Sequence, residues 1–480
     1  MKILFIIEQL NLVEPLGLMY LMTVAKENGH DYKLAVNQLE DALSKSLQYK
    51  PDIVAVSSMS AEFGGLLALS KEIKKRTNAF VVFGGVHVTF YRDSISEDSI
   101  DAICVGEGEG AFLELLQRME AGKEIRGIRN ILTDVKDKLE VRSSEQDLDS
   151  FSFPDRETIY NNYKSLKKNG MKSFITSRGC PYPCTYCFNY KFNQIYKGKG
   201  KIVRRRSVSN VIDEIKAVKS KYRIDIIRFG DDSFVLRKDA WLEEFARRFK
   251  KEVNITFYCL VQPDIITEDI IILLKNAGCY SISMSIEAGN SELRKGTLRR
   301  RVSNEQLKLA FDLCHKHGLK TYSAVMVGLP DSTIKHDIES VDFAIECRPN
   351  ISPFLIFMPF PGTQLGELCI KKGYYDGDLK KVYSNQTISP LSCFTDKEKD
   401  IQKNLTYLAP VAIKFPVLRN LIINCLIYWK PNKIFFVIQF LLLGYLWGFV
   451  IAPWKYNLLD VFDGVKKALT FWTNIQTEQH

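Results

Sequence analysis

Short apolar runs alternate with amphipathic stretches six times from residue 171 onward, and this rhythm restricts the fold more than any other feature. The apolar runs predict strands at 172–177, 224–229, 254–260, 280–286, 320–327 and 352–358. The amphipathic stretches predict helices at 207–222, 238–250, 267–277, 303–317 and 333–347. Six strands alternating with the five helices between them predict a curved parallel sheet, a partial (β/α)6 version of the TIM barrel. Its chemistry is then expected at the carboxyl ends of the strands.

A first α/β region precedes this series. Its predicted strands are 2–7, 31–36, 53–58, 79–83 and 101–105, and its predicted helices are 15–29, 40–49, 62–77 and 109–121. Such alternation predicts a doubly wound parallel sheet, which binds ligands at the carboxyl ends of its strands. Residues 128–142 predict a small hairpin. The predicted domains are this α/β domain at 1–140, a linker at 141–168, the barrel at 169–374 and a mostly helical, hydrophobic C-terminal region at 375–480.

Composition is typical of a folded protein in a reducing compartment. Of the 480 residues, 46% are hydrophobic and 25% are charged, as in ordinary globular proteins with more than one core. Most of the eleven cysteines stand singly in apolar runs, so a cytoplasmic location is expected rather than a secreted one. The net charge of +10 permits contact with nucleic acid or anionic lipid but requires neither. The densest basic run, residues 197–206, is expected to be a solvated loop.

A C-x3-C-x2-C pattern follows the first predicted barrel strand and is formed by Cys180, Cys184 and Cys187. Pro181 and Pro183 argue against a helix there, so a loop is expected to carry the thiols. Thiolates select zinc, copper(I) or iron–sulfur centres, and structural zinc normally takes four ligands. A [4Fe–4S] cluster on three thiolates keeps one iron open for an outside ligand, which favours that cluster. A structural zinc site or three unligated buried cysteines are the alternatives.

The cysteine pattern, with the aromatic Tyr186 before its last cysteine, resembles the signature of the radical S-adenosylmethionine (SAM) enzymes. The resemblance implies that SAM chelates the open iron, and that one electron from the cluster cleaves SAM to a 5′-deoxyadenosyl radical. Later segments resemble the same family: "RFGDDSF", "SISMSIEAGN", "MVGLP" and "PFPGTQL". The residues that the resemblance assigns to SAM are Tyr186, Asp231, Asp232, Ser285, Glu287, Val327 and Gly328.

Within that set the resemblance implies different contacts. Asp231 or Asp232 would meet the ammonium group of SAM, and capping of the next helix is the alternative for this pair. The segment with Ser285 and Glu287 would face the ribose and methionine part, and "MVGLP" would lie by the adenine. The chain departs from the commoner pattern at position 285, where Gly is usual, and at Gln262, where many relatives have Arg. No general base is predicted.

Three segments of the first domain resemble the cobalamin-binding domain that precedes the radical domain in one large subgroup: "EPLGLMYLMTVAKENGHDYKL", "VVFGGVHVTF" and "DAICVGEGEGAF". The resemblance implies a corrin ring approached closely by the backbone of small residues. The residues assigned to cobalamin are Ser57, Ser58, Ser60, Gly84, Gly85, Gly106 and Glu107. The spacing G-x-G-x-G disfavours a dinucleotide site, which needs G-x-G-x-x-G. A domain that has lost its cofactor is the alternative.

The first domain lacks the D-x-H-x-x-G motif, so cobalamin without a lower histidine ligand is expected. His30 ends a predicted helix, where a cation complements the dipole, and is expected to be structural. His87 follows Gly84 and Gly85 and is either close to a ligand or a packed loop residue.

Residues 434–452 are apolar except for Gln439, which is borderline for a helix that spans a membrane. Trp429, Lys430 and Lys433 precede this segment, and Trp454 and Lys455 follow it, as at a membrane boundary. Contact with a membrane surface is one interpretation. A helix buried against the barrel or in a dimer interface is the alternative.

These features together predict a radical SAM enzyme that uses a [4Fe–4S] cluster, SAM and cobalamin to methylate an unactivated carbon of a small or lipid-like substrate. One alternative is a radical SAM cyclase or oxidase in which cobalamin does not methylate. An alternative of another class is a non-catalytic cobalamin or metal sensor at a membrane. A reducing partner such as flavodoxin or ferredoxin is expected, and nucleic acid is not, because no recognised RNA-binding module is found.

Overall fold

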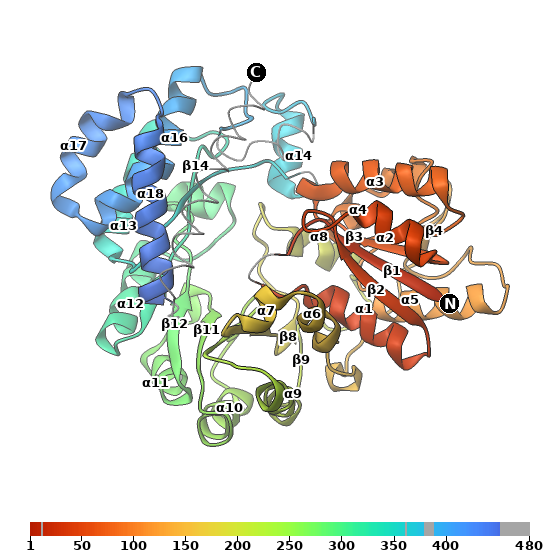
Figure 1. Cartoon of the computed structure of the whole chain (residues 1–480). Coiled ribbons are helices and arrows are strands. Elements are labelled where there is room, and N and C mark those ends of the chain that lie inside the picture. The colour runs from red at the N-terminus through yellow and green to blue at the C-terminus, as the bar shows by residue number, and fades with distance from the viewer. Residues whose placement is uncertain (11–12, 361, 379–387, 452–480) are drawn as a thin grey trace. The chain divides into compact units, whose positions relative to one another are not determined.

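The computed structural model describes residues 1–10, 13–360, 362–378 and 388–451 (Figure 1). The chain packs into two compact units. Unit 1 comprises residues 1–181 and 188–223, and unit 2 comprises residues 182–187 together with the chain from residue 224 onward. The predicted domains are continuous ranges of sequence, whereas these units are defined by packing. The predicted domain limits therefore stay predictions.

Unit 1 is built on a six-stranded sheet of order β2-β1-β3-β4-β5-β6. The strands are β1 (Lys2–Ile7), β2 (Asp31–Val36), β3 (Ile53–Ser57), β4 (Phe80–Gly84), β5 (Ala102–Cys104) and β6 (Ile131–Leu132). The first five are parallel, which confirms the predicted doubly wound sheet. The predicted hairpin at 128–142 does not form as two paired strands, because β6 pairs antiparallel with β5; the segment still turns back, and the N–H of Asn130 donates to the carbonyl of Glu140 at 2.7 Å.

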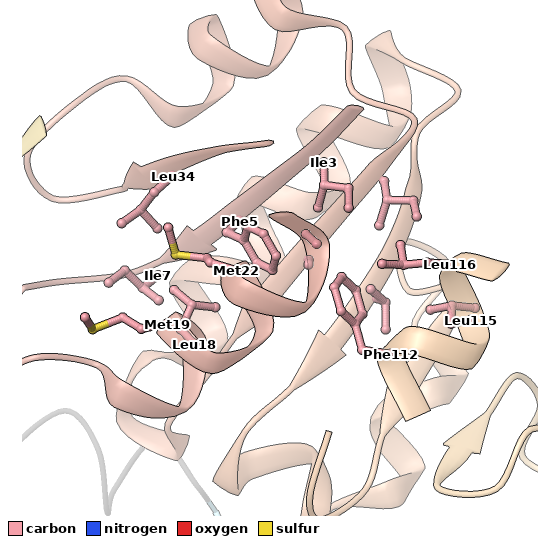
Figure 2. Packing of buried hydrophobic residues seen from close by; sticks show 14 of the residues in the cluster. Ile3, Phe5, Ile7, Leu18, Met19, Met22, Leu34, Phe112, Leu115 and Leu116 are labelled. Atoms are coloured by element: carbon pink, nitrogen blue, oxygen red, sulfur yellow. The ribbon is translucent and has the colours of Figure 1, made fainter. Parts of the chain in front are cut away.

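Alternate residues of β1 explain why helices cover both faces of this sheet. Ile3, Phe5 and Ile7 pack with the helices α1 (Leu16–Glu27) and α5 (Glu109–Glu120), as Figure 2 shows. Leu4 and Ile6 belong to the opposite core, with α2 (Ala42–Tyr49), α3 (Phe63–Arg76) and α4 (Val86–Phe90). Successive side chains of a strand point to opposite faces, so a run of apolar residues must be buried on both sides.

The rest of unit 1 follows the sheet in the chain. Its elements are α6 (Arg156–Asn162), α7 (Lys164–Lys168), β7 (Met171–Phe174), β8 (Ser177–Arg178), α8 (Phe188–Ile195), β9 (Arg204–Arg205) and α9 (Val208–Lys221). The short strands β8 and β9 pair antiparallel.

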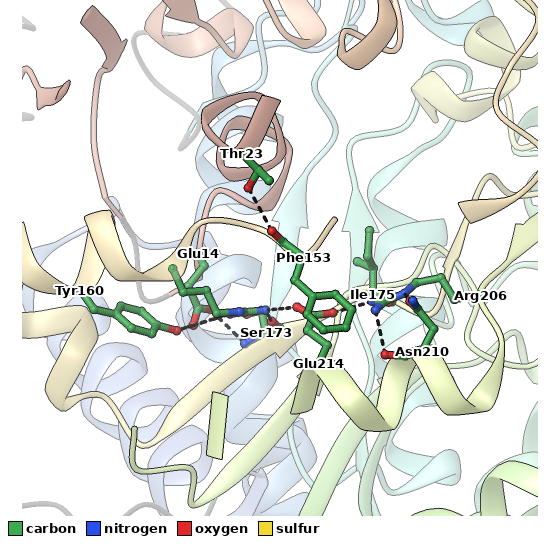
Figure 3. Close-up of polar contacts among 10 residues, drawn as sticks. Glu14, Thr23, Phe153, Tyr160, Ser173, Ile175, Arg206, Asn210 and Glu214 are labelled. Atoms are coloured by element: carbon green, nitrogen blue, oxygen red, sulfur yellow. Dashed lines mark hydrogen bonds and ion pairs between the residues drawn. The ribbon is translucent and has the colours of Figure 1, made fainter. Parts of the chain in front are cut away.

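A buried network of charges joins these elements (Figure 3). Arg156 donates from Nη2 to Oε1 of Glu214 at 2.9 Å, and its Nη1 lies 3.6 Å from Oε1 of Glu14. Arg206 donates from Nη1 to the other carboxylate oxygen of Glu214 at 2.6 Å. All four side chains are at most 5% exposed. Buried charges are tolerated only when each has its partner, so this network fixes α6, α9 and the segment before α1 together.

The buried network corrects one expectation. The basic run 197–206 is not a solvated loop throughout, because Arg204 and Arg206 are buried and paired with Glu107 and Glu214, respectively. The lysines of the run, Lys197, Lys199 and Lys201, are exposed as expected. The amino-acid composition of the run does not show which of its basic residues are buried and which are exposed.

Unit 2 contains the later strand–helix series, which confirms the predicted partial barrel. The strands β10 (Ile226–Phe229), β11 (Thr256–Leu260), β12 (Cys279–Ser283) and β13 (Lys320–Tyr322) are parallel neighbours, and β14 (Val325–Val327) pairs parallel with β15 (Phe354–Ile356). The helices are α10 (Ala240–Glu252), α11 (Glu268–Ala277), α12 (Asn304–Lys316), α13 (Ile334–Cys347) and α14 (Gln364–Lys371). The predicted strand 320–327 is broken at Ser323, whose hydroxyl accepts a hydrogen bond from the backbone N–H of Ile286.

The C-terminal part of unit 2 is helical, as predicted, up to residue 451; residues 452–480 lie outside the described part. Its helices are α16 (Asp396–Lys414), α17 (Arg419–Asn424) and α18 (Lys433–Tyr445), and a π-helical turn, Leu446–Ile451, continues α18. Residues 401–413 of α16 are all buried, because the helix packs among β14, β15, α13 and α18.

The strand β11 shows which face of the unit 2 sheet is covered by the π-helical turn that follows α18. Phe257 packs against Phe245 and Phe249 of α10, with ring centroids 5.8 and 5.3 Å apart. The next residue, Tyr258, points to the opposite face and contacts Trp447 of the π-helical turn, with the ring centroids 6.1 Å apart. The segment that follows α18 therefore covers the face of the sheet that α10 leaves open.

Candidate functional site

A cavity of about 270 Å³ opens in unit 1 at the carboxyl ends of β3, β4 and β5. Apolar side chains from α1 and α5, among them Leu18, Leu21 and Phe112, form part of its wall. Of the seven residues predicted for cobalamin, five line it: Ser57, Gly84, Gly85, Gly106 and Glu107. The other two, Ser58 and Ser60, do not; Ser58 is buried behind the loop and donates its N–H to the carbonyl of Gly84 at 3.0 Å.

Gly85 shows why this loop needs a residue without a side chain. Its φ is +96°, and a Cβ atom there would lie 2.6 Å from the carbonyl oxygen of Ser58. Both the left-handed backbone and the close approach exclude any larger residue without movement of β3 or β4. The glycine therefore maintains the shape of the cavity floor.

Replacing Gly85 by alanine is expected to lower the free energy of unfolding by about 2 kcal/mol or more, because the new methyl group meets backbone rather than a flexible side chain. Urea unfolding of the apoprotein measures this. Gly64→Ala is the matched control: Gly64 lies in α3 and a Cβ there meets nothing within 4 Å, so that variant should keep or gain stability. Equal stability of the two variants would contradict the role given to Gly85.

Arg178 brings a cation to the wall of the cavity. Its Nη2 donates to Oε1 of Glu109 at 2.6 Å, and its guanidinium lies over the ring of Tyr20 at 5.2 Å. Burial opposes ionisation of Glu109, but the nearby Arg178 charge holds the pKa of this carboxyl below its usual value. Arg178 stands two residues before Cys180, so it ties the strand that leads into the cysteine loop to the cavity rim.

Neither histidine of the first domain, His30 or His87, lines the cavity. His87 is 1% exposed and is stacked between Phe63 and Tyr91, with ring centroids 3.8 and 4.8 Å away. Burial lowers its pKa to about 4, so it is neutral at pH 7. Of the two interpretations, the packed residue is the one the structure supports, although His87 lies in α4 rather than in a loop. Among the described residues that line the cavity there is no histidine.

The cysteine loop is irregular, as the prolines predict, with a turn at residues 185–186 before α8. Cys180 belongs to unit 1, and Cys184 and Cys187 belong to unit 2. Within unit 2 the loop is fastened by Thr185, whose carbonyl accepts the N–H of Leu365 at 2.9 Å and whose N–H donates to Leu298 at 3.3 Å. In the described part of the chain no three His, Cys, Asp or Glu side chains are grouped as metal ligands. Ligation of one cluster by all three cysteines stays a prediction.

A buried carboxylate–guanidinium site adjoins Cys184 in unit 2. The hydroxyl of Tyr186 donates to Oε1 of Glu287 at 2.9 Å, and Nη1 of Arg300 donates to the same oxygen at 2.9 Å. Nη2 of Arg300 donates to Oε1 of Gln262, also at 2.9 Å. Burial raises the pKa of the Cys184 thiol, and the charge of Arg300 opposes that rise. Five positions spread over more than 100 residues of sequence therefore meet at one place.

Glu287 is held in an unusual conformation at this site. Its φ is +64°, which is rare for a residue with a side chain and is tolerated where the surroundings fix it. Backbone bonds to Ala324 and Met326 hold the residue beside β14. Burial raises the pKa of Glu287, against the effect of Arg300 and of hydrogen bonds from Tyr186 and Ser285. The structure thus brings together three of the residues predicted for SAM.

The other residues predicted for SAM lie at neighbouring strand ends of unit 2. Asp231 is buried and Asp232 half-buried in the loop after β10. The capping alternative for this pair is wrong, because Asp239 caps α10 by accepting the N–H of Leu242 at 3.0 Å. Val327 ends β14, and the N–H of the following glycine donates to Asp337 at 3.1 Å. Direct contact of these residues with SAM stays a prediction.

Sequence reasoning missed Arg300. The residue is one of three consecutive arginines, of which Arg299 is exposed and Arg300 is 7% exposed. The departure at Gln262 was the available signal. With glutamine at this position, the buried cation that neighbours Glu287 comes from residue 300.

Two family models match the chain, and they match it in the order of the predicted domains. The B12 binding domain matches residues 4–116, and the Radical SAM superfamily matches residues 174–344. An uncharacterised methyltransferase of Pyrococcus horikoshii is 28% identical over 74% of this chain and 78% of its own length. An anaerobic magnesium-protoporphyrin IX monomethyl ester cyclase of Rubrivivax gelatinosus is 24% identical over 73% of this chain and 65% of its own length.

A solved structure shares the fold. It is the radical S-adenosylmethionine methyltransferase TsrM from Kitasatospora setae with cobalamin and a [4Fe–4S] cluster bound, with a TM-score of 0.63 at 19% identity, covering 77% of this chain and 78% of that one. The segments that the two family models match contain most of the residues that line the cavity of unit 1, as well as the Tyr186–Glu287 contact of unit 2. The chain is an enzyme of the radical SAM superfamily that carries a B12 binding domain ahead of its radical SAM domain.

Proposed function

We propose that this enzyme is a cobalamin-dependent methyltransferase that acts on an unactivated carbon of a small or hydrophobic substrate. The observation that carries the proposal is the convergence of Tyr186, Ser285 and Glu287 beside Cys184, since these residues come from separate segments that resemble SAM-binding motifs. The glycine-lined cavity at the strand ends of the B12 binding domain supports the second cofactor.

The donor sets fit the cofactors by their chemistry. Cys180, Cys184 and Cys187 would hold the cluster, and the cavity walled by Gly84, Gly85 and α1 would hold cobalamin. When bound, these groups and SAM supply one-electron cleavage of a C–S bond and a transferable methyl group. The protein's own part is to fasten the cysteine loop through Thr185, to orient Glu287, and to exclude water.

Anaerobic reconstitution with iron, sulfide and cobalamin tests the proposal. We expect an optical spectrum with both cluster and corrin bands, and formation of 5′-deoxyadenosine once SAM and a strong reductant are added. Supplying SAM with a deuterated methyl group to an extract of the source cells should yield a product that carries that methyl group. A sample that binds zinc alone, or a cluster that does not respond to SAM, would contradict the assignment.

A cyclase is the second candidate, because a relative named as a cyclase matches 73% of this chain. The product decides between the two. A methyltransferase adds a labelled methyl group, whereas a cyclase changes the substrate mass without incorporating one. Both require the same cluster and SAM site.

Replacing Arg300 by glutamine is expected to reduce SAM cleavage about 10- to 100-fold, as loss of a supporting contact to a metal-site residue commonly does. The variant removes the cation from a buried carboxylate, so Glu287 loses its fixed orientation. The rate of 5′-deoxyadenosine formation measures the effect. Arg299→Gln is the matched control, because that neighbouring arginine is exposed. Equal rates for the two variants would show that Arg300 does not position the site.

A further inference from the structure

The helix α18 and the turn after it present an apolar stripe to solvent. Along the stripe, Ile434, Ile438, Leu441, Tyr445 and Phe449 are between 42% and 70% exposed. Their spacing of three and four residues places them on one side of the helix. The segment Lys433–Ile451 is long and apolar enough to cross a membrane by length and composition, yet only 22% of it is buried. An exposed apolar surface of this kind marks an interaction site.

A second exposed apolar group lies at α17 and in the 3-10 turn Pro416–Leu418 before it, and both pack on α16 as α18 does (Figure 1). Val417 is 88% exposed and Leu421 is 53% exposed. The aromatic residues Tyr428 and Trp429, just before α18, are also more than half exposed. Tyrosine and tryptophan side chains with one apolar and one polar end favour the boundary between lipid and water.

The opposite side of α18 is fastened to unit 2. Gln439 donates from Nε2 to the carbonyl of Thr406 at 3.0 Å, and the hydroxyl of Ser281 donates to the carbonyl of Ile451 at 3.0 Å. Trp447 packs against the rings of Tyr258 and Tyr322, with ring centroids 6.1 and 5.7 Å apart. A helix that crossed a bilayer would have to give up these contacts. The fold therefore favours a helix that lies along a surface with one side exposed.

Basic residues predominate in the sequence around the stripe, although Arg419 and Lys430 pair with Asp342 and Asp400, respectively. From residue 401 to residue 451 the sequence has five basic residues and no aspartate or glutamate: Lys403, Lys414, Arg419, Lys430 and Lys433. Lys430 pairs with Asp400 at 3.0 Å and still keeps 93% of its side chain exposed. Exposed lysines next to an apolar face complement anionic lipid headgroups. A second copy of the same face would bring like charges together, which disfavours a dimer through this surface.

We propose that unit 2 binds the surface of an anionic lipid bilayer through this face, with α18 lying in the plane of the membrane and Lys430 and Lys433 at the headgroups. The exposed stripe would enter the acyl boundary, while the contacts of Trp447 and Ile451 remain in place. Attachment of this kind is peripheral and does not depend on the cofactors or on the reaction that the enzyme catalyses.

Flotation of the full-length protein with lipid vesicles tests the proposal. We expect the protein to float with vesicles that contain phosphatidylglycerol, to float much less with phosphatidylcholine alone, and to be released by high salt or alkaline carbonate. The double substitution L441E and F449E should reduce the bound fraction at least about tenfold, because it places two charges in the part of the stripe that would enter the acyl region of the bilayer. Both positions are exposed, so circular dichroism should show an unchanged fold.

Leu309→Glu is the matched control, because Leu309 is 56% exposed on α12, outside the stripe. That variant should float like the unmodified protein. Reversal of the charge at one lysine, by Lys433→Glu, should weaken binding to anionic vesicles about fivefold or more.

Three results would overturn the inference. Absence of flotation with both kinds of vesicle would exclude the membrane. Retention in the membrane after carbonate treatment would indicate a spanning helix instead. A dimer in solution that L441E and F449E dissociate, without vesicle binding, would assign the face to a second copy of the chain.

Discussion

Replacement of Cys184 by alanine is expected to abolish SAM cleavage and to reduce the iron content of the reconstituted protein. A three-thiolate site that loses one ligand cannot hold a [4Fe–4S] cluster with one open iron, so we expect at least about a 100-fold loss, more than changes at residues that only support a metal ligand usually cause. Iron and sulfide analysis, the optical spectrum of the cluster and the yield of 5′-deoxyadenosine measure the effect.

Cys393→Ala is the control for cysteine replacement as such, because Cys393 is exposed. Its iron content and SAM cleavage should match those of the unmodified protein. Full iron content and turnover in Cys184→Ala would exclude the cysteine loop as the cluster site, and with it the proposed chemistry.

Replacement of Glu214 by alanine is expected to lower the free energy of unfolding by about 3–5 kcal/mol, because it leaves two buried guanidinium groups without their shared carboxylate. Arg156 and Arg206 both donate to Glu214, and both are buried. For a unit of this size we expect the melting temperature to fall by about 10 °C. Thermal unfolding of the apoprotein followed by circular dichroism measures the change.

The adjacent residue supplies the control. Asp213 lies on the same helix α9 but is exposed, so Asp213→Ala should change stability by no more than about 0.5 kcal/mol. If Glu214→Ala unfolds at the same temperature as Asp213→Ala, the buried network does not stabilise unit 1 as described.

The fold of both units could be predicted because apolar periodicity decides it locally. Continuous apolar runs such as Ile3–Ile7 require cover on both faces, and the two cores around β1 provide it. The glycines and the serine at the ends of β3 and β4 predicted the cavity, since Ser57, Gly84 and Gly85 all line it. The converging site residues of unit 2 could be predicted only through a resemblance, because sequence spacing does not reveal which strand ends meet.

Long-range pairing accounts for what could not be predicted. Arg300 and Arg299 are the same residue type at adjacent positions, but only Arg300 donates to Glu287 and Gln262, and these neighbours are set by tertiary structure. In the same way, Gln402, Lys403 and Asn404 would be placed on the surface by their polarity, yet all three are buried because other elements surround α16. The bond from Ile286 to Ser323, which interrupts a predicted strand, is likewise invisible in a local pattern.

Trp447 has a practical consequence for protein engineering. The ring of Trp447 lies against Tyr258 and Tyr322. Truncation that removes the chain from residue 433 onward would therefore expose part of the sheet of unit 2, as well as removing the apolar stripe. Loss of lipid binding in such a truncated protein could result from misfolding, so truncation does not separate loss of the fold from loss of the lipid-binding surface. Point changes at the solvent-facing positions of α18 keep the two apart.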